Sequence, residues 1–454
     1  MSGAGVGGFG DARLGRVGAL LLERVQERQT LCLHALADAR TETLRFGRFL
    51  DSDAVSAEEM LVQAGRQTAR RAAGRHILAI QDTTELHFAG HAASKHGFGR
   101  AGNGEDIGLF LHPTIAVDAA HGGVVGLVGA TVLNRTAGKV APRRQRTAEA
   151  RESHRWLAGA RSAEAVLEQA AMITVVADRE SDIYDLFARR PARVHLLSRA
   201  AQDRGLAEGG RLFAHAAALP GQAHHVIAVP GRGARPARQA VVALRFGAVT
   251  LLRPATAARD LAERVVVHLV DVAEATPPPG EPALHWCLLT THAVADVAAA
   301  QQVVGWYQAR WTIEQVFRSL KSAALAAEES QVCEARRFIR LAVIGLIAAV
   351  RIVQIVLGRD GATGQPLNDA ADPGNLPVLH ALNAKLQGRT ARLRNPHRPD
   401  SLAWFAWIVA RLGGWSGYTS KGYKPAGPKT IARGLIRLDG RIEGWHLAHH
   451  SANV

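Results

Sequence analysis

Residues 76–88 read HILAIQDTTELHF, and residues 172–178 read MITVVAD. The first stretch alternates and is rich in branched residues, and the second is a short apolar run. In both, residues typical of a strand lead to an aspartate. In α/β sheets, side chains at the carboxyl ends of strands converge on the crevice where ligands bind. We therefore expect Asp82 and Asp178 to face one crevice, although an aspartate after a strand is more often a turn or helix-capping residue.

Outward from these two stretches, strand and helix patterns alternate. Residues 113–135 predict two strands joined by a glycine turn, and residues 149–169 and 182–190 predict helices. Residues 193–200 predict another strand, so the order is three strands, helix, strand, helix, strand. Residues 211–292 contain several more strand patterns separated by Gly and Pro turns. The fold class is therefore α/β, and residues 211–292 are mostly β.

The chain divides into four expected units. Residues 1–75 have helical apolar spacing and form an N-terminal helical unit. Residues 76–357 form the α/β core. The turn-rich residues 358–377 are expected to be a linker, and residues 378–454 form a C-terminal helical unit.

Composition indicates a globular, basic protein. The chain has 454 residues, of which 47% are hydrophobic and 21% charged, so it is not a disordered chain. The formal net charge of +15 favours a polyanion as partner. The alternative is that a biased base composition has enriched the chain in Arg without a functional reason.

Cysteine usage and the apolar segments favour a cytoplasmic protein. Cys32, Cys287 and Cys333 are too scattered for a disulfide framework or a zinc site. We expect no signal peptide, because the first residues have no apolar segment behind a basic head. The apolar run at 341–357 is short for a membrane span and contains Arg351, so we expect a buried helix.

A third acidic residue lies in the segment GWYQARWTIEQVFRSLKSA, at 305–323. On one continuous helix, Tyr307, Arg310, Glu314 and Lys321 fall within an arc of about 60° that borders the apolar stripe. Glu314 could then join the two aspartates in an oxygen-rich site for Mg²⁺ or Mn²⁺. The alternative is an ordinary surface ion pair between Arg310 and Glu314.

The spacing Tyr-x2-Arg-x3-Glu-x6-Lys resembles the signature of the insertion-sequence-four family of bacterial DDE transposases. The chain is most similar to the branch that holds the hairpin-forming cut-and-paste transposase of the kanamycin-resistance composite transposon. Five further blocks resemble the family in the expected order, at 9–17, 81–88, 177–187, 284–291 and 401–415.

The resemblance implies an RNase H-like (retroviral-integrase-like) catalytic core with a β-rich insertion, at about 211–292. It also implies that Asp82, Asp178 and Glu314 are the catalytic residues and the metal ligands, with Asp178 and not Asp182 as the second. Two Mg²⁺ ions per active site, for which Mn²⁺ can substitute, would support phosphodiester hydrolysis and strand transfer. The implied reaction is cut-and-paste transposition through a hairpin intermediate.

The resemblance further implies that Tyr307, Arg310 and Lys321 contact DNA phosphates. Trp286 matches a tryptophan that stacks on a base flipped out during hairpin formation. Stacking of this kind is worth about 1–3 kcal/mol. The alternative for Trp286 is core packing, because strands favour Trp.

The expected partners are double-stranded DNA, as transposon ends and as target, and a second copy of the chain in a homodimer. Arg66, Arg70 and Arg71 are candidates for binding the transposon end, or they form an ordinary solvated face. The C-terminal unit is expected to make the dimer, although the apolar segment 401–412 could equally cap the core. The expected location is the bacterial cytoplasm, on the nucleoid when bound to DNA.

Two rival functions remain open. The first is a catalytically inactive DNA-binding protein, either an inhibitor or a decayed relative. The second is an unrelated hydrolase with paired carboxylates, such as a glycosidase. The intact acidic residues argue against the first, and the basic charge and the Arg–Lys stripe argue against the second.

Overall fold

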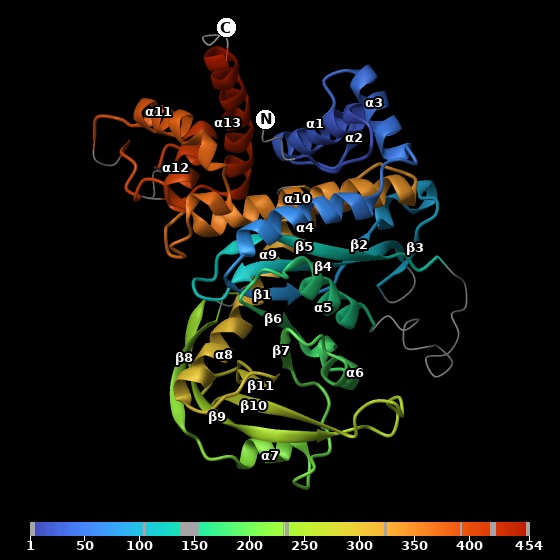
Figure 1. The fold of residues 1–454 in the computed structure, drawn as a ribbon, viewed down its shortest axis with the longest axis vertical. Helices are drawn as coiled ribbons and strands as arrows, with labels where there is room; N and C mark the ends of the chain where they lie inside the picture. The colour runs from blue at the N-terminus through green and yellow to red at the C-terminus, as the bar shows by residue number, and fades with distance from the viewer. Residues whose placement is uncertain are drawn as a thin grey trace.

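The computed structural model describes residues 5–102, 106–136, 154–229, 231, 236–321, 325–390, 393–417 and 424–450. It is a mixed α/β fold in which helices cover both faces of one large sheet (Figure 1). The strands are β1 (His76–Gln81), β2 (Thr84–His87), β3 (Gly99–Ala101), β4 (Asp106–Asp118), β5 (Val124–Leu133), β6 (Met172–Ala177), β7 (Val194–Arg199), β8 (Ala223–Val229), β9 (Arg238–Leu252), β10 (Arg264–Glu274) and β11 (His285–Thr290).

The helices surround this sheet. They are α1 (Ala12–Arg28), α2 (Leu33–Leu36), α3 (Arg40–Asp51), α4 (Ala57–Ala72), α5 (His154–Val166), α6 (Tyr184–Ala188), α7 (Leu212–Ala218), α8 (Val297–Ala309), α9 (Trp311–Lys321), α10 (Ala335–Gly358), α11 (Leu376–Leu386), α12 (Leu402–Leu412) and α13 (Pro428–His450).

The sheet is parallel only at its centre. Its order is β2-β4-β1-β6-β7-β11-β10-β9-β8, with β3 and β5 also paired to β4. The pairs β1–β6 and β6–β7 are parallel, and the other pairs are antiparallel. The predicted order of strands and helices between residues 76 and 200 is therefore present, with the short β2 and β3 added. Strand β9 runs through Gly247, where a turn between two strands was expected.

Both faces of strand β1 are buried, because the sheet has a core on each side. Leu78 and Ile80 belong to the core shared with α9 and α10, whereas Ile77 and Ala79 belong to the core shared with α5. Successive side chains of a strand point to opposite faces, so an uninterrupted apolar run fits a strand covered on both sides. Residues 77–81 are all buried, so the alternation expected for this strand is absent, because both of its faces are covered.

Helix α10 lies between the sheet and the terminal helices (Figure 1). It is long and apolar enough to cross a membrane, but 78% of its most apolar window is buried within the protein. The buried helix expected over 341–357 is thus the central helix of the fold. Together with α4, helix α10 also covers strand β5.

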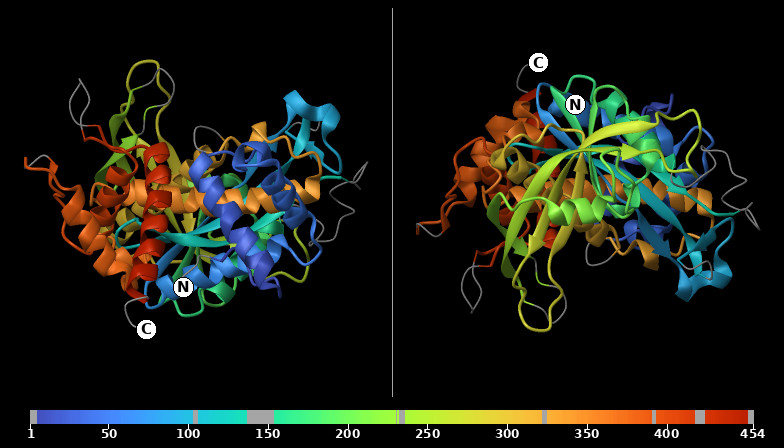
Figure 2. Two further views of the ribbon diagram at one scale, coloured as in Figure 1. Left: turned by 90° about the horizontal axis from the view of Figure 1, so that it is seen from above. Right: turned by 90° about the horizontal axis from the view of Figure 1, so that it is seen from below.

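The terminal units differ from the expected division in one respect. Helix α4 lies within the predicted N-terminal unit, 1–75, but it packs directly on β5 and α10 as a layer of the core. Helices α1–α3 lie beyond α10, as do α11–α13, and α1 and α13 lie side by side (Figure 2). Gln29 is the residue after α1, and its side-chain amide donates a hydrogen bond to the backbone carbonyl of Lys429 on α13, at 2.8 Å.

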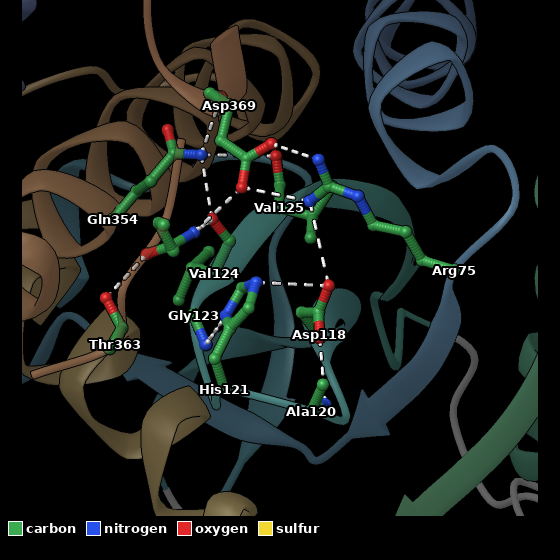
Figure 3. A network of polar contacts seen from close by, with 11 residues as sticks. Arg75, Asp118, Ala120, His121, Gly123, Val124, Val125, Gln354, Thr363 and Asp369 are labelled. Atoms are coloured by element: carbon green, nitrogen blue, oxygen red, sulfur yellow. Dashed lines mark hydrogen bonds and ion pairs between the residues drawn. The ribbon is translucent and has the colours of Figure 1, made fainter. Parts of the chain in front are cut away.

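Residues 358–377, the segment expected to be a linker, are packed against the core. Asp369 is 1% exposed, and its carboxylate accepts a hydrogen bond from Arg75 Nη1 at 3.0 Å (Figure 3). Gln354 on α10 donates to the carbonyls of Asp369 and Val124, each at 2.8 Å. A turn-rich composition predicts an irregular backbone but does not predict whether it is buried. Here the contacts of Asp369 and Gln354 hold the segment in place.

Helix α12 is buried on almost every side. It forms a core of its own with α11, α13 and the segment around Leu367. Of its residues, only Arg411 is not buried. Its apolar surface is therefore buried within the C-terminal unit and against the end of α10.

Three histidines meet where the parallel strands begin. Thr174 Oγ1 on β6 lies 2.8 Å from His76 Nε2 and 2.7 Å from His292 Nε2, and the rings of His195 and His292 stack at 3.9 Å. Burial, together with the neighbouring His195 and His76, lowers the pKa of His292 to about 3. Burial also lowers the pKa of His76 and of His195.

We expect the protein to lose stability as the pH falls below about 6.5, the ordinary pKa of histidine. Between that value and the lowered pKa values, the unfolded chain binds protons that the folded chain does not, so the free energy of unfolding decreases. For His292 the loss is about 1–2 kcal/mol between pH 7 and pH 5. Urea unfolding at several pH values measures it, and His292→Gln should flatten the dependence. An unchanged slope in that variant would contradict the assignment.

Candidate active site

Asp82 and Asp178 follow neighbouring parallel strands at the same level. Ile80 on β1 is paired with Val176 on β6, so each aspartate comes two residues after a matched pair. Ile80 and Val176 face the core shared with α9, and side chains two apart share a face. The fold therefore directs both aspartates to the side of the sheet that carries α9.

Asp82 is held in a shielded, crowded position. Its Oδ1 accepts the backbone N–H of Thr83 at 2.8 Å, and its Oδ2 accepts Arg310 Nη1 at 3.0 Å. Burial and the nearby carboxylate of Asp178 raise the pKa of Asp82 to about 7, with a smaller contribution from Glu314. Arg310 opposes this rise. The charge of Asp82 is thus influenced by both of the other candidate carboxylates.

Asp178 also caps a turn, the alternative raised for a strand-end aspartate. Its Oδ1 accepts the backbone N–H of Glu180 at 2.9 Å. Asp182 is engaged elsewhere: it accepts from Ala201 and Gln202, and it is paired with the Arg204 guanidinium at 2.6 Å. With its side chain fully buried by these partners, Asp182 is a structural anchor.

Glu314 lies on α9, which a break at Arg310 separates from α8. One continuous helix was expected through 305–323, but α8 ends at Ala309 and α9 begins at Trp311. The backbone tightens there, because Ile313 donates to the Arg310 carbonyl three residues back, at 3.2 Å. The Arg310 guanidinium donates to Asp82 and, through Nη2, to Glu314 Oε1, each at 3.0 Å.

The break changes the polar stripe predicted on a continuous helix. Tyr307 and Arg310 are buried, at 3% and 8% exposed, and Arg310 Nε has no hydrogen-bond partner. Lys321, at the end of α9, is paired with Glu328 at 3.3 Å. The expected ion pair between Arg310 and Glu314 is therefore present. It is not an ordinary surface pair, because Arg310 is buried and also binds Asp82.

Trp286 on β11 is a buried neighbour of Tyr307. The two rings meet edge to face, with centroids 5.1 Å apart, and Trp286 is 7% exposed. Burial raises the pKa of the Tyr307 phenol. The position fits the core-packing alternative for Trp286 and leaves base stacking untested.

The three candidate arginines of α4 differ in their surroundings. Arg66 and Arg70 are exposed. Arg71 is half-buried, its Nη1 is 3.5 Å from the Val125 carbonyl, and burial lowers its pKa. Arg66 and Arg70 therefore face solvent, whereas Arg71 is turned toward β5.

Within the described residues, no group of three or more His, Cys, Asp and Glu side chains could hold a metal ion as it stands. The site contains a cation of its own, since Arg310 bridges Asp82 and Glu314. The donor set still fits a divalent ion, because carboxylate oxygens are the ligands that Mg²⁺ and Mn²⁺ prefer. Burial is the main cause of the raised pKa of Asp82, and the neighbouring carboxylates add to it. A divalent ion would relieve the repulsion between these carboxylates.

Sequence reasoning missed the polar side chains that surround the two aspartates. His112 on β4 lies 2.9 Å from Thr83 Oγ1 and 3.3 Å from Gln81 Oε1. Arg155 on α5 donates to Thr83 Oγ1 at 3.1 Å and to Glu180 Oε2 at 2.9 Å. The only available signal was that Gln81 and Thr83, both polar, flank Asp82 directly after an apolar run.

The fold and the site define a class: α/β proteins that gather carboxylates where central parallel strands end. Residues 74–351, more than half of the chain, match the family model described as "Transposase DDE domain". The chain belongs to this family and is a DDE transposase. The family implies nuclease and transposase activity on DNA, and DDE transposases generally use divalent metal ions.

Proposed function

We propose that the protein catalyses cut-and-paste transposition of an insertion sequence, as a member of the insertion-sequence-four family. The proposal includes an RNase H-like core and a hairpin intermediate, as in the branch of the kanamycin-resistance composite transposon. The carrying observation is the convergence of Asp82 and Glu314 on one guanidinium, with Asp178 on the adjacent parallel strand. These acidic groups come from remote parts of the chain.

Asp82, Asp178 and Glu314 are proposed as the ligands of two Mg²⁺ ions, for which Mn²⁺ can substitute. When bound, such ions lower the pKa of an attacking water or 3′ hydroxyl and stabilise the leaving oxygen. Arg310 is well suited to hold a DNA phosphate, because its guanidinium binds two oxygens at once. Tyr307 and Lys321 are proposed as further phosphate contacts, one as a hydroxyl donor and the other as a point charge.

Double-stranded DNA, as transposon ends and as target, is the proposed substrate in the bacterial cytoplasm. Arg66 and Arg70 are proposed contacts to the transposon end. A homodimer through the C-terminal unit would use a surface other than α12, which is buried within the chain. Leu447 on α13 is exposed, and we propose that it lies on that surface.

The test of the proposed function is incubation of the full chain with DNA that carries the transposon ends, with and without Mg²⁺. Nicks and hairpins are scored on denaturing gels. Metal-dependent nicking at the ends supports the proposal. Binding without cleavage under every metal condition would favour the inactive DNA-binding alternative.

Arg310→Gln is expected to tighten Mn²⁺ binding by the DNA-free protein. The guanidinium occupies oxygens of both Asp82 and Glu314, and an added cation is repelled by its charge. At an effective dielectric constant of about 20, a charge pair within contact distance is worth a few kcal/mol, so at least about a tenfold gain is expected. Isothermal titration calorimetry measures it.

The matched control is Arg245→Gln. Arg245 on β9 pairs with the buried Asp271 at 3.0 Å, several strands away from β1. Its loss removes the same charge from a similar ion pair and should leave Mn²⁺ affinity unchanged. Equal or weaker binding in Arg310→Gln would show that the guanidinium does not compete with the metal.

Trp286→Ala is expected to reduce hairpin formation more than first-strand nicking, if its indole stacks on a flipped base. Because Trp286 is buried against Tyr307, the same change also costs about 3–5 kcal/mol of stability. Trp286→Phe keeps an aromatic ring and separates the two effects. Gel assays of each step, beside thermal unfolding, measure both. Equal loss of nicking and hairpins would assign Trp286 to packing.

A further inference from the structure

The loops that carry Asp82 and Asp178 are tied to each other by a single side chain. Arg155 Nε donates to the hydroxyl of Thr83, the residue after Asp82, at 3.1 Å. Its Nη2 donates to Glu180 Oε2 at 2.9 Å, and the backbone of Glu180 is held by Asp178. Arg155 therefore spans the gap between two loops whose acidic residues must act together.

A buried histidine fixes the other side of the Asp82 loop. His112, which is 1% exposed, contacts Thr83 through Nδ1 and Gln81 through Nε2. Its ring also packs edge to face on Trp156, the residue after Arg155, with centroids 4.5 Å apart. The residues on both sides of Asp82 are thus held by one ring, and that ring is braced by the helix that carries Arg155.

The energetics indicate that this connection sets geometry more than stability. The side chain of Glu180 is 60% exposed, and an ion pair with one exposed partner contributes at most about 1 kcal/mol. Groups that orient metal ligands have a larger effect on the site, since their loss weakens metal binding by about 10–100-fold.

We propose that Arg155 is a positioning residue, which sets the separation of the Asp82 and Asp178 carboxylates by linking Thr83 to Glu180. The inference rests on the proposed function, because it assumes that those carboxylates share metal ions. Arg155 acts through its two neighbours and needs no contact with DNA.

The experiment is calorimetric titration of Mn²⁺ alone into the full chain without DNA. The variants are Arg155→Gln, Glu180→Gln and the double variant, with thermal unfolding recorded for each. Positioning predicts that each single change weakens Mn²⁺ binding by about 10–100-fold, and that the double variant is no weaker than either single one. The control, Arg161→Gln, removes the same charge from an exposed position on the same helix and should bind Mn²⁺ normally.

A simple effect of charge predicts a different pattern. Without positioning, loss of the Arg155 charge would strengthen Mn²⁺ binding, whereas loss of the Glu180 charge would weaken it. Stronger or unchanged binding in Arg155→Gln overturns the inference, and so do additive effects in the double variant. If Arg155→Gln unfolds, Arg155→Lys decides the matter, because it keeps the charge but lacks the fork that reaches both Thr83 and Glu180. Positioning then predicts weaker Mn²⁺ binding, whereas a simple charge effect predicts unchanged binding and would overturn the inference.

Failure of the proposed function can be distinguished from failure of the positioning role of Arg155. If the wild-type chain binds no Mn²⁺, or if Asp82→Asn binds it as tightly as the wild type does, the metal site itself is wrong. If the wild type binds Mn²⁺ and Asp82→Asn does not, the metal site stands and the Arg155 variants test positioning alone.

Discussion

Asp82→Ala, Asp178→Ala and Glu314→Ala are each expected to lower DNA cleavage by at least about a thousandfold. Metal ions contribute several kcal/mol of transition-state stabilisation, and each 1.4 kcal/mol is about a factor of ten in rate. Each variant removes one carboxylate from a set of three, so none should retain a site that holds two ions. Single-turnover nicking of end-bearing DNA measures the loss.

DNA binding distinguishes loss of chemistry from loss of fold. Gel-shift affinity should stay near that of the wild type in all three variants, because each change removes a negative charge and leaves the basic surface intact. The matched control is Asp260→Ala, which removes an exposed carboxylate paired with Arg189 outside the site. Retained nicking in any of the three variants would remove that residue from the catalytic set.

Asp369→Ala is expected to destabilise the protein by about 3 kcal/mol. Removing one partner of a buried ion pair leaves the other charge without compensation. Here the loss leaves Arg75 with the more distant carboxylate of Asp118, at 3.7 Å, in place of both acidic partners (Figure 3). The Gln365 amide also loses one acceptor. Urea unfolding measures the change, and proteolysis within residues 358–377 reports whether this segment detaches.

Asp372→Ala is the control for this change. Asp372 lies three residues away in the same segment, but it is exposed and its carboxylate only caps a short turn through Gly374. Its loss should cost about 1 kcal/mol or less. A similar cost in both variants would show that the ion pair of Asp369 with Arg75 adds nothing beyond local turn structure.

The sequence predicts the parts of the site that depend on local pattern. Asp82 and Asp178 could be placed at strand ends because apolar runs precede them, and the fold brings those strands together as parallel neighbours. Glu314 could be placed on a helix by its apolar period. These inferences need only the regular geometry of one element at a time.

The parts that depend on packing could not be predicted. The break before α9 is invisible to a periodic pattern, because Arg310 itself keeps helical backbone angles. The contacts of Arg155 with Thr83 and Glu180 join three segments whose relative placement no local rule supplies. Residues 358–377 contain turn signals, yet burial of Asp369 depends on Arg75, which is 294 residues away in the sequence.

The convergence at Arg310 has a consequence for synthesis of the chain. Arg310 contacts Asp82, which lies 228 residues earlier in the chain. Glu314 comes after both aspartates and after the whole of the β8–β11 segment. A ribosome therefore completes both aspartate strands long before it adds the glutamate. If the three acidic residues act together as proposed, the emerging polypeptide cannot cut DNA until α9 has been added. Under the same proposal, a product of translation that stops before α9 lacks the third acidic residue and has no cleavage activity.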